Sequence, residues 1–301
     1  MTLGFQGSLY ILAFDHRGSF RKKLGVGSDP TPEEQRKVSD AKALIFEGFQ
    51  HALSEGAPRE AAGMLVDDEY GDEVARKASA EGLNLAMPVE KSGQDEFDFE
   101  YGADFGAHIE HFDPTFSKVL VRYNPEGDRE MNARQIVRLK ELSDWLHERD
   151  RKFLFELLVP AEEQQLASVD EDVDRYDTEI RPRLMLETIR DLHAGGVEPD
   201  IWKIEGLDRR EDCEAVSELV RSGGRDGVAC IVLGRGADDQ AVELWLRQGA
   251  GVPGYVGFAI GRTIWGGPLM GYVEGSLDRG SAAKRIAQAY LHFIEVYADA
   301  A

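Results

Sequence analysis

The stretch Ile201-Trp202-Lys203-Ile204-Glu205-Gly206 places two charged residues inside a short apolar run that ends at a glycine. Such a run predicts a short buried strand, on which alternation points Lys203 and Glu205 away from Trp202. Burying an ammonium is costly because desolvation disfavours its charged form. A lysine held neutral can attack a carbonyl and form a Schiff base. The alternative is an ordinary strand lysine whose ammonium reaches solvent at the strand end.

Similar apolar runs recur along the whole chain, separated by longer stretches with apolar residues at helical spacing. The predicted strands cover residues 10–15, 63–67, 83–89, 117–122, 153–159, 201–206, 228–233 and 255–260. The predicted helices cover residues 33–53, 71–81, 131–149, 181–194, 237–248 and 281–297, and the acidic stretch 170–177 is predicted to be a solvated loop. Strands that alternate with amphipathic helices are typical of βα units around a parallel sheet.

Eight such strands predict an α/β fold of the (β/α)8 TIM-barrel type. An open doubly wound sheet is the alternative, but no GxGxxG motif follows the first strand. A chain of 301 residues is long enough for one barrel, and we expect residues 1–301 to form a single domain.

Composition restricts the partners of the protein. No apolar run approaches the roughly 18 residues of a membrane span, and the amino terminus lacks a secretory pattern. We therefore expect a cytoplasmic protein with no membrane partner. A formal charge of −21 argues against binding to nucleic acid. Cys213 and Cys230 lack zinc or redox spacing and are expected to be reduced. The oligomeric state stays open, with a homo-oligomer as one alternative.

The active site of a TIM barrel lies at the C-terminal ends of its strands. Lys203 should point into the barrel there, because the bulky Trp202 suits the layer between sheet and helices. Glu156 lies within the preceding apolar run, so burial should raise its pKa unless a cation pairs with it. On the neighbouring strand it is placed to move protons for Lys203. The alternative is a carboxylate that only forms a salt bridge with Lys118 or Lys203.

Basic residues gather at these strand ends in an otherwise acidic protein. Six of them are Arg17, Lys91, Arg122, Lys203, Arg235 and Arg262. Together they predict a locally positive funnel, which an anionic sugar phosphate requires. The loops Gly234-Arg235-Gly236 and Gly261-Arg262 follow the seventh and eighth strands, where barrels often bind phosphate. The alternative is that these glycines serve only tight turns.

The histidines do not favour a metal enzyme. Only His16 lies at a strand end, while His108 and His111 are predicted to lie in a loop. A zinc site needs several converging imidazoles, so we expect no metal. The acidic residues 67–69 could supply oxygen ligands to magnesium, although we favour a hydrogen-bonding role for them.

Short motifs at the strand ends together resemble a known family. They are Ala13-Phe14-Asp15-His16-Arg17-Gly18, Leu65-Val66-Asp67-Asp68-Glu69-Tyr70-Gly71, Val89-Glu90-Lys91-Ser92-Gly93, Lys118-Val119-Leu120-Val121-Arg122-Tyr123, Phe155-Glu156-Leu157, Trp202-Lys203-Ile204-Glu205 and Gly257-Phe258-Ala259. This set resembles the class I aldolases of the tagatose-1,6-bisphosphate aldolase group. It is most similar to the 2-deoxy-5-keto-gluconate 6-phosphate aldolase-like domain fused to some 5-dehydro-2-deoxygluconokinases of myo-inositol catabolism. The resemblance runs from about residue 9 to residue 262.

The resemblance implies a lyase that cleaves or condenses a phosphorylated ketose or keto-sugar acid through a lysine Schiff base, without metal or organic cofactor. The catalytic residues would be Lys203, Glu156 and Asp15. The substrate-binding residues would be Arg17, Glu90, Lys91, Lys118, Arg122 and Glu205. The phosphate-binding residues would be Gly234, Arg235, Gly236, Gly261 and Arg262.

Two departures from the family pattern both face the expected substrate. His16 replaces a glutamine, and the loop Gly234-Arg235-Gly236 replaces a turn that contains serine. They put the identity of the substrate in doubt more than the Schiff-base chemistry. Two other functions stay open: a sugar-phosphate isomerase or epimerase that uses carboxylates alone, and a catalytically silent barrel that binds sugar phosphates for regulation.

Overall fold

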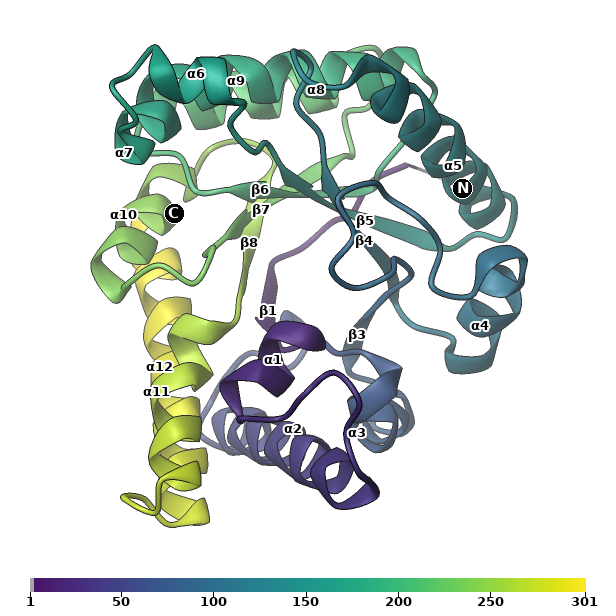
Figure 1. Ribbon diagram of the computed structural model, residues 1–301. Helices are drawn as coiled ribbons and strands as arrows, with labels where there is room; N and C mark the ends of the chain where they lie inside the picture. The colour runs from purple at the N-terminus through teal and green to yellow at the C-terminus, as the bar shows by residue number, and fades with distance from the viewer. Residues whose placement is uncertain (1–2) are drawn as a thin grey trace.

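The protein is an eight-stranded parallel barrel surrounded by helices (Figure 1). The computed structural model describes residues 3–301. The strands are β1 (Leu9–Ala13), β2 (Ala62–Leu65), β3 (Asn84–Pro88), β4 (Phe116–Arg122), β5 (Lys152–Leu158), β6 (Ile201–Glu205), β7 (Ala229–Leu233) and β8 (Tyr255–Ile260). They pair in chain order, and β8 pairs with β1 to close the barrel. The predicted TIM barrel is confirmed, and every predicted strand agrees with an observed one to within two residues.

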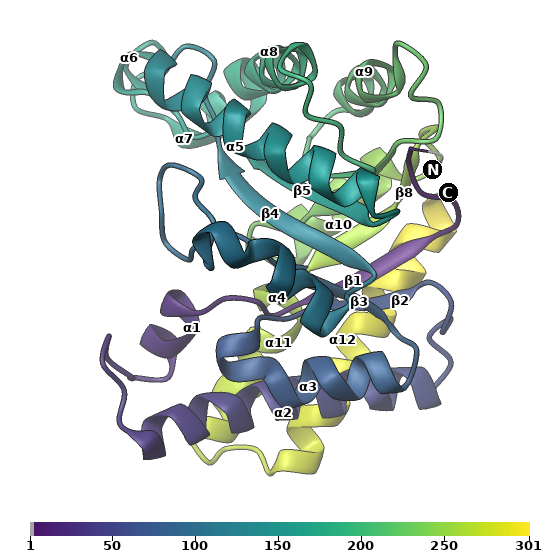
Figure 2. The same ribbon diagram turned by 90° about the vertical axis from the view of Figure 1, so that its right-hand side faces the viewer.

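The long helices cover the outside of the barrel, and several short ones lie beyond the C-terminal ends of the strands (Figure 2). The main ones are α2 (Pro32–Ser54), α3 (Asp68–Ala80), α5 (Arg129–Glu148), α8 (Arg181–Ala194), α9 (Arg210–Arg221), α10 (Asp239–Gly249), α11 (Arg262–Val273) and α12 (Arg279–Ala300). The shorter ones are α1 (Gly18–Lys23), η1 (Gly102–Asp104), α4 (Phe105–Phe112), α6 (Glu163–Ala167), α7 (Val173–Arg175) and η2 (Tyr176–Ile180). In Figure 2, α1, α6 and α7 lie on the side towards which the strands run.

Two predictions about loops were wrong. The stretch 170–177 is largely helical, because α7 and the π-helical turn η2 occupy residues 173–180. The buried ring of Tyr176 holds this segment against the barrel, and its hydroxyl donates to the carbonyl of Val159 at 2.9 Å. His108 and His111 lie in α4, which forms because Phe105 and Ile109 bury one face of the helix.

The barrel contains two apolar layers, as the strand alternation predicts. Ile201 belongs to the inner cluster that fills the barrel. Trp202 and Ile204 belong to the larger cluster between sheet and helices. Lys203 therefore points inward, and it lies directly opposite Glu156 in the register of β5 and β6. Within residues 3–301, no helix is long and apolar enough to cross a bilayer.

A buried carboxylate closes the N-terminal end of the barrel. Asp200 is fully buried and accepts hydrogen bonds from the backbone N–H of Gly4 at 2.8 Å and of Phe153 at 2.9 Å. Its oxygens also contact Lys152 at 2.9 Å and His147 at 3.2 Å. Burial opposes ionisation of Asp200, but these partners outweigh it and lower its pKa. Asp200 thus joins the N-terminal segment to the start of β5.

We predict that Asp200→Asn lowers the free energy of unfolding at pH 7 by about 3 kcal/mol, because the neutral amide would lose the ion pair with Lys152 and could not accept all the hydrogen bonds that the buried carboxylate receives. Because the folded pKa of Asp200 lies below its unfolded value, its contribution is complete above about pH 4. The contribution disappears as pH falls through the folded pKa. Urea unfolding between pH 3 and pH 7 should show the two proteins converging in acid. The exposed Asp226→Asn is the matched control, and equal effects of both changes would contradict the prediction.

Candidate active site

A cavity of about 950 Å³ opens at the C-terminal ends of the strands. All of the sequence-predicted catalytic, substrate-binding and phosphate-binding residues lie on its wall. The structure thus brings together residues that are as far apart in the sequence as Asp15 and Arg262. Their roles stay predictions, whereas their convergence in one cavity is an observation.

Five charged side chains meet at the bottom of the cavity, and we call them the lysine–carboxylate cluster. The Nζ atom of Lys118 contacts Asp15 at 2.8 Å, Glu90 at 2.7 Å and Glu156 at 3.1 Å. The same Oε2 atom of Glu156 lies 2.9 Å from the Nζ atom of Lys203. Glu156 therefore bridges two ammonium groups. The salt bridges considered as the alternative role of Glu156 are both present, and they leave it within proton-transfer distance of Lys203.

The three carboxylates of the lysine–carboxylate cluster have pKa values shifted in different directions. Burial disfavours ionised carboxylates, but the lysines outweigh it and lower the pKa of Asp15 and of Glu156. The sequence-based expectation of a raised pKa for an unpaired Glu156 therefore does not apply. Burial prevails at Glu90 and raises its pKa, and its Oε2 atom is buried without a hydrogen-bond partner.

Lys118 and Lys203 differ in the carboxylates that surround their ammonium groups. Burial disfavours the ammonium of Lys118, but three neighbouring carboxylates outweigh it and raise its pKa. A firmly protonated amine cannot act as a nucleophile. Among residues 3–301, one carboxylate, Glu156, lies within ion-pair distance of Lys203, whose side chain is 3% exposed on the wall of the cavity. Of the two amines, Lys203 is the better placed to reach a carbonyl.

A third buried lysine, which the sequence reasoning missed, supports the loop after β1. Lys42 of α2 is fully buried and donates to the carbonyls of Phe14 at 2.9 Å and His16 at 3.1 Å. It also pairs with Asp67, which accepts the backbone N–H of Tyr70 at the start of α3. This arrangement fixes the backbone that carries Asp15. Its signal in the sequence was one lysine on the apolar face of the helix.

His16 occupies a fixed position on the cavity wall. Its ring packs edge-on against Trp265, with centroids 6.0 Å apart. Burial lowers the pKa of His16 to about 4, so the imidazole is neutral near pH 7. Its Nδ1 atom lies 3.8 Å from Asp15 and is buried without a hydrogen-bond partner. A neutral imidazole offers one donor and one acceptor, whereas a glutamine amide offers two N–H donors and a carbonyl acceptor.

The basic residues at the strand ends are mostly paired. Arg17 contacts Glu100 at 2.8 Å, and Lys91 contacts Asp98 at 2.8 Å. The cavity wall holds eight lysines and arginines and seven aspartates and glutamates. The predicted positive funnel is therefore much weaker than a count of basic residues suggests.

Arg122 and Arg262 are the exceptions on the rim. Arg122 donates to the carbonyl of Gln94 at 2.8 Å, and Arg262 donates to that of Arg235 at 2.8 Å. In the part of the chain that the structure describes, no carboxylate lies within ion-pair distance of either guanidinium. Their charges are available to an anion.

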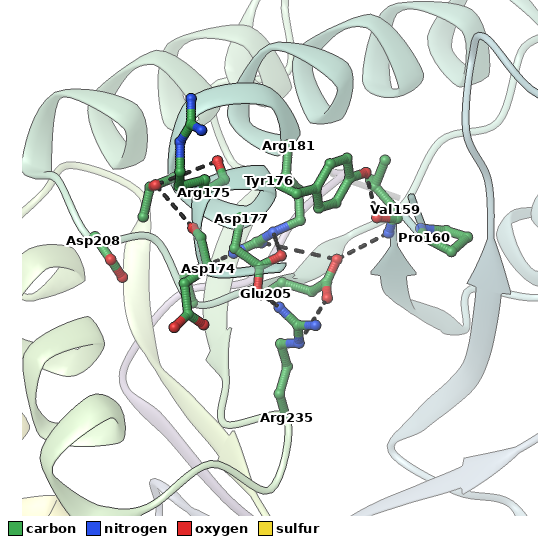
Figure 3. A network of polar contacts seen from close by, with 12 residues as sticks. Val159, Pro160, Asp174, Arg175, Tyr176, Asp177, Arg181, Glu205, Asp208 and Arg235 are labelled. Carbon is green, nitrogen blue, oxygen red and sulfur yellow. Dashed lines mark hydrogen bonds and ion pairs between the residues drawn. The ribbon is translucent and has the colours of Figure 1, made fainter. Parts of the chain in front are cut away.

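Arg235 belongs to a separate network, which we call the Asp177 ion cluster (Figure 3). Asp177 contacts Arg181 at 2.9 Å and Arg235 at 2.5 Å. Glu205 lies 3.1 Å from Arg235 and 3.9 Å from Arg181, and it accepts the backbone N–H of Val159 at 2.9 Å. Burial raises the pKa of Glu205 despite the two guanidiniums. Two positive and two negative groups thus alternate at the ends of β6 and β7.

The glycines of the two predicted phosphate loops have structural reasons of their own. Gly236 has a left-handed backbone with φ +75°, and a Cβ there would lie 2.6 Å from the guanidinium of Arg262. A Cβ on Gly261 would lie 2.4 Å from the carbonyl oxygen of Ala13. Both positions need glycine for a turn or a close approach, as the alternative interpretation of these glycines expects.

The acidic residues after β2 do not share a site. Asp67 is bound to Lys42, while Asp68 accepts hydrogen bonds from Tyr101 and His108. Across residues 3–301, no group of three or more histidine, cysteine, aspartate or glutamate side chains is arranged to hold a metal ion.

Comparison with known proteins identifies a family and a fold. A family model described as "Uncharacterized protein conserved in bacteria (DUF2090)" matches residues 5–301. No curated protein matches the chain. The crystal structure of Cgl0159 from Corynebacterium glutamicum is similar, with a TM-score of 0.55 and 17% identity. The match covers 97% of this chain and 88% of that one. At this identity the similarity concerns the fold alone.

We predict that Lys118→Met lowers the free energy of unfolding by about 3–5 kcal/mol at pH 7, because three buried carboxylates lose their common cation. Glu156 would keep its contact with Lys203, but for Asp15 and Glu90 uncompensated burial would then raise the folded pKa values above the unfolded ones. The stability of the variant should therefore increase as pH falls from 7 to 5, whereas wild type should change little. Denaturant unfolding measures both. Lys140→Met, which removes an exposed lysine, is the control, and a pH-independent loss in Lys118→Met would contradict this account.

Proposed function

The chain belongs to the DUF2090 family of uncharacterised bacterial proteins, and we propose that it is a class I aldolase acting on a phosphorylated ketose or keto-sugar acid. The observation that carries the proposal is the 2.9 Å contact between Lys203 and Glu156 at the bottom of the cavity. An amine beside a carboxylate that can take and return its proton is what imine formation requires.

Schiff-base formation starts with transfer of a proton from the Lys203 ammonium to Glu156. The free amine adds to the carbonyl carbon of the substrate, and Glu156 returns the proton to the carbinolamine hydroxyl as water leaves. The product is a protonated imine on Lys203. Lys118 keeps Glu156 oriented in this step through its 3.1 Å contact.

Carbon–carbon cleavage then uses the imine as an electron sink. Glu156, again a carboxylate, accepts the proton of the substrate hydroxyl next to the bond that breaks. The electron pair of that bond moves to the imine nitrogen, which gives an enamine and releases an aldehyde. Protonation of the enamine carbon and hydrolysis by water restore Lys203. No metal or organic cofactor takes part in this sequence.

The remaining cavity residues suit a polyhydroxylated substrate. Asp15, whose lowered pKa keeps it ionised, can accept hydrogen bonds from hydroxyl groups, and so can the unpartnered Oε2 atom of Glu90. Arg262 offers an uncompensated charge to a phosphate. The substrate 2-deoxy-5-keto-gluconate 6-phosphate fits this description, and inositol catabolism is the pathway that the resemblance to the kinase-fused domains suggests.

A sugar-phosphate isomerase or epimerase is the second candidate. It is favoured by Glu90, whose raised pKa and unpartnered Oε2 atom would allow proton transfer without an imine. Turnover that survives Lys203→Met would select this function. Binding of sugar phosphates without turnover, with Lys203 dispensable, would select a regulatory barrel instead.

We predict that incubation with substrate and borohydride leaves a reduced adduct on the tryptic peptide that contains Lys203. Phosphorylated ketoses and keto-sugar acids should be screened, with mass spectrometry as the readout. Lys203→Met should abolish the adduct and reduce turnover at least 1000-fold, about the scale lost with a covalent nucleophile. Lys140→Met should retain both. An adduct that maps to Lys118 instead would refute the assignment.

We also predict that Glu156→Gln lowers turnover by about 10²–10⁴-fold, the usual contribution of general acid–base catalysis. The amide still accepts a hydrogen bond but cannot move a proton. The adduct on Lys203 should therefore form more slowly and still be detected after long incubation. Glu163→Gln, an exposed change in α6, serves as the control. Full turnover in Glu156→Gln would exclude its role as the proton carrier.

A further inference from the structure

The Asp177 ion cluster changes what Arg235 can bind. Both the Nε and NH1 atoms of Arg235 face carboxylates, Glu205 at 3.1 Å and Asp177 at 2.5 Å. Asp177 is held in turn by Arg181, which is buried and also donates to the carbonyl of Gly206 at 2.8 Å. The two carboxylates balance the charges of Arg181 and Arg235, and this cancels the attraction that the exposed guanidinium of Arg235 would exert on a phosphate.

The neighbouring side of the cavity, between β8 and β1, carries an excess of positive charge. A smaller pocket of about 280 Å³ adjoins the cavity there, and His16 and Arg262 form part of the wall of both. Lys22 and Lys23 of α1 line this pocket as well. Among the described residues 3–301, no carboxylate lies within ion-pair distance of Lys22, Lys23 or Arg262. Uncompensated positive charge is therefore concentrated between β8 and β1.

The two sides are in direct contact where the chain leaves β7 and β8. Arg262 donates to the backbone carbonyl of Arg235, and its guanidinium packs against Gly236. Arg235 itself has a left-handed backbone with φ +49°. This contact positions Arg262 from the loop after β7, while the side chain of Arg235 turns away towards Asp177 (Figure 3). The loop thus presents Arg262, and not Arg235, to an anion.

We propose that Asp177 is a specificity-determining residue that keeps phosphate off Arg235 and reserves the β6–β7 side of the cavity for the uncharged, hydroxyl-bearing part of the substrate. The phosphate binds on the β8–β1 side, at Arg262. The orientation of a sugar phosphate over Lys203 follows from this division. The choice of a sugar phosphate as ligand rests on the proposed aldolase function, but the division of charge does not.

Inorganic phosphate is the probe that tests this division, with affinity measured by titration calorimetry on the full chain. In the wild-type background, Arg262→Ala should weaken phosphate binding at least tenfold and Arg235→Ala less than threefold. Asp177→Asn should strengthen phosphate binding at least fivefold, because it frees Arg235. The double variant Asp177→Asn, Arg235→Ala should lose that gain.

Asp174→Asn is the matched control, because it removes the same charge from the same segment at an exposed position outside the ion cluster. It should change phosphate affinity less than twofold. A general change in protein charge would move both variants equally, whereas the proposal requires a gain at Asp177 that depends on Arg235. Circular dichroism of each variant checks that the barrel is folded.

The inference is overturned if Arg235→Ala weakens phosphate binding as much as Arg262→Ala, a comparison that does not depend on the Asp177 variants. It is also overturned if Asp177→Asn gives no gain, or if wild type shows no phosphate binding that Arg262→Ala weakens. Phosphate binding does not require an imine, so these outcomes are independent of borohydride trapping on Lys203. A protein that passes the phosphate test and forms no adduct would lose the aldolase function and keep this binding site.

Discussion

The centre of the barrel depends on the ammonium of Lys118. Three carboxylates, from the loops after β1 and β3 and from β5, lie within 3.1 Å of it, in a region where its side chain is 1% exposed. Without a cation at their common point, these carboxylates would repel each other and would be costly to bury. One ion therefore makes the polar end of the barrel possible, and it also orients Glu156 towards Lys203.

Much of this centre could be predicted from the sequence because strand alternation is a local property. The period of two residues points Lys203 inward and Trp202 outward whatever the loops do. The rule that barrel sites lie at strand ends then brings Glu156 and Lys203 together. The observed register, in which the two residues lie opposite each other, agrees with that expectation.

The electrostatic character of the cavity could not be predicted in the same way. The partners of the basic residues, such as Glu100, Asp98 and Asp177, come from loops and short helices whose paths no periodicity encodes. The acidic composition around Asp177 predicted a solvated loop, although Tyr176 in the same stretch holds it against the barrel through a hydrogen bond. A protein of charge −21 consequently has a cavity of nearly balanced charge, in which arrangement and not total charge selects the ligand.

The π-helical turn η2 offers a route by which mutation could change the ligand that the cavity selects. Each hydrogen bond of a π-helix spans five residues, one more than in an α-helix, and the adjacent Tyr176 and Asp177 of this turn both line the cavity. Each residue of an α-helix turns the chain by about 100°. Loss of one codon in η2 would thus rotate Asp177 away from Arg235 and leave Lys203 and Glu156 unaltered. On the role proposed for Asp177, a single deletion in the gene could redirect ligand choice without substituting any residue that touches the reacting bond.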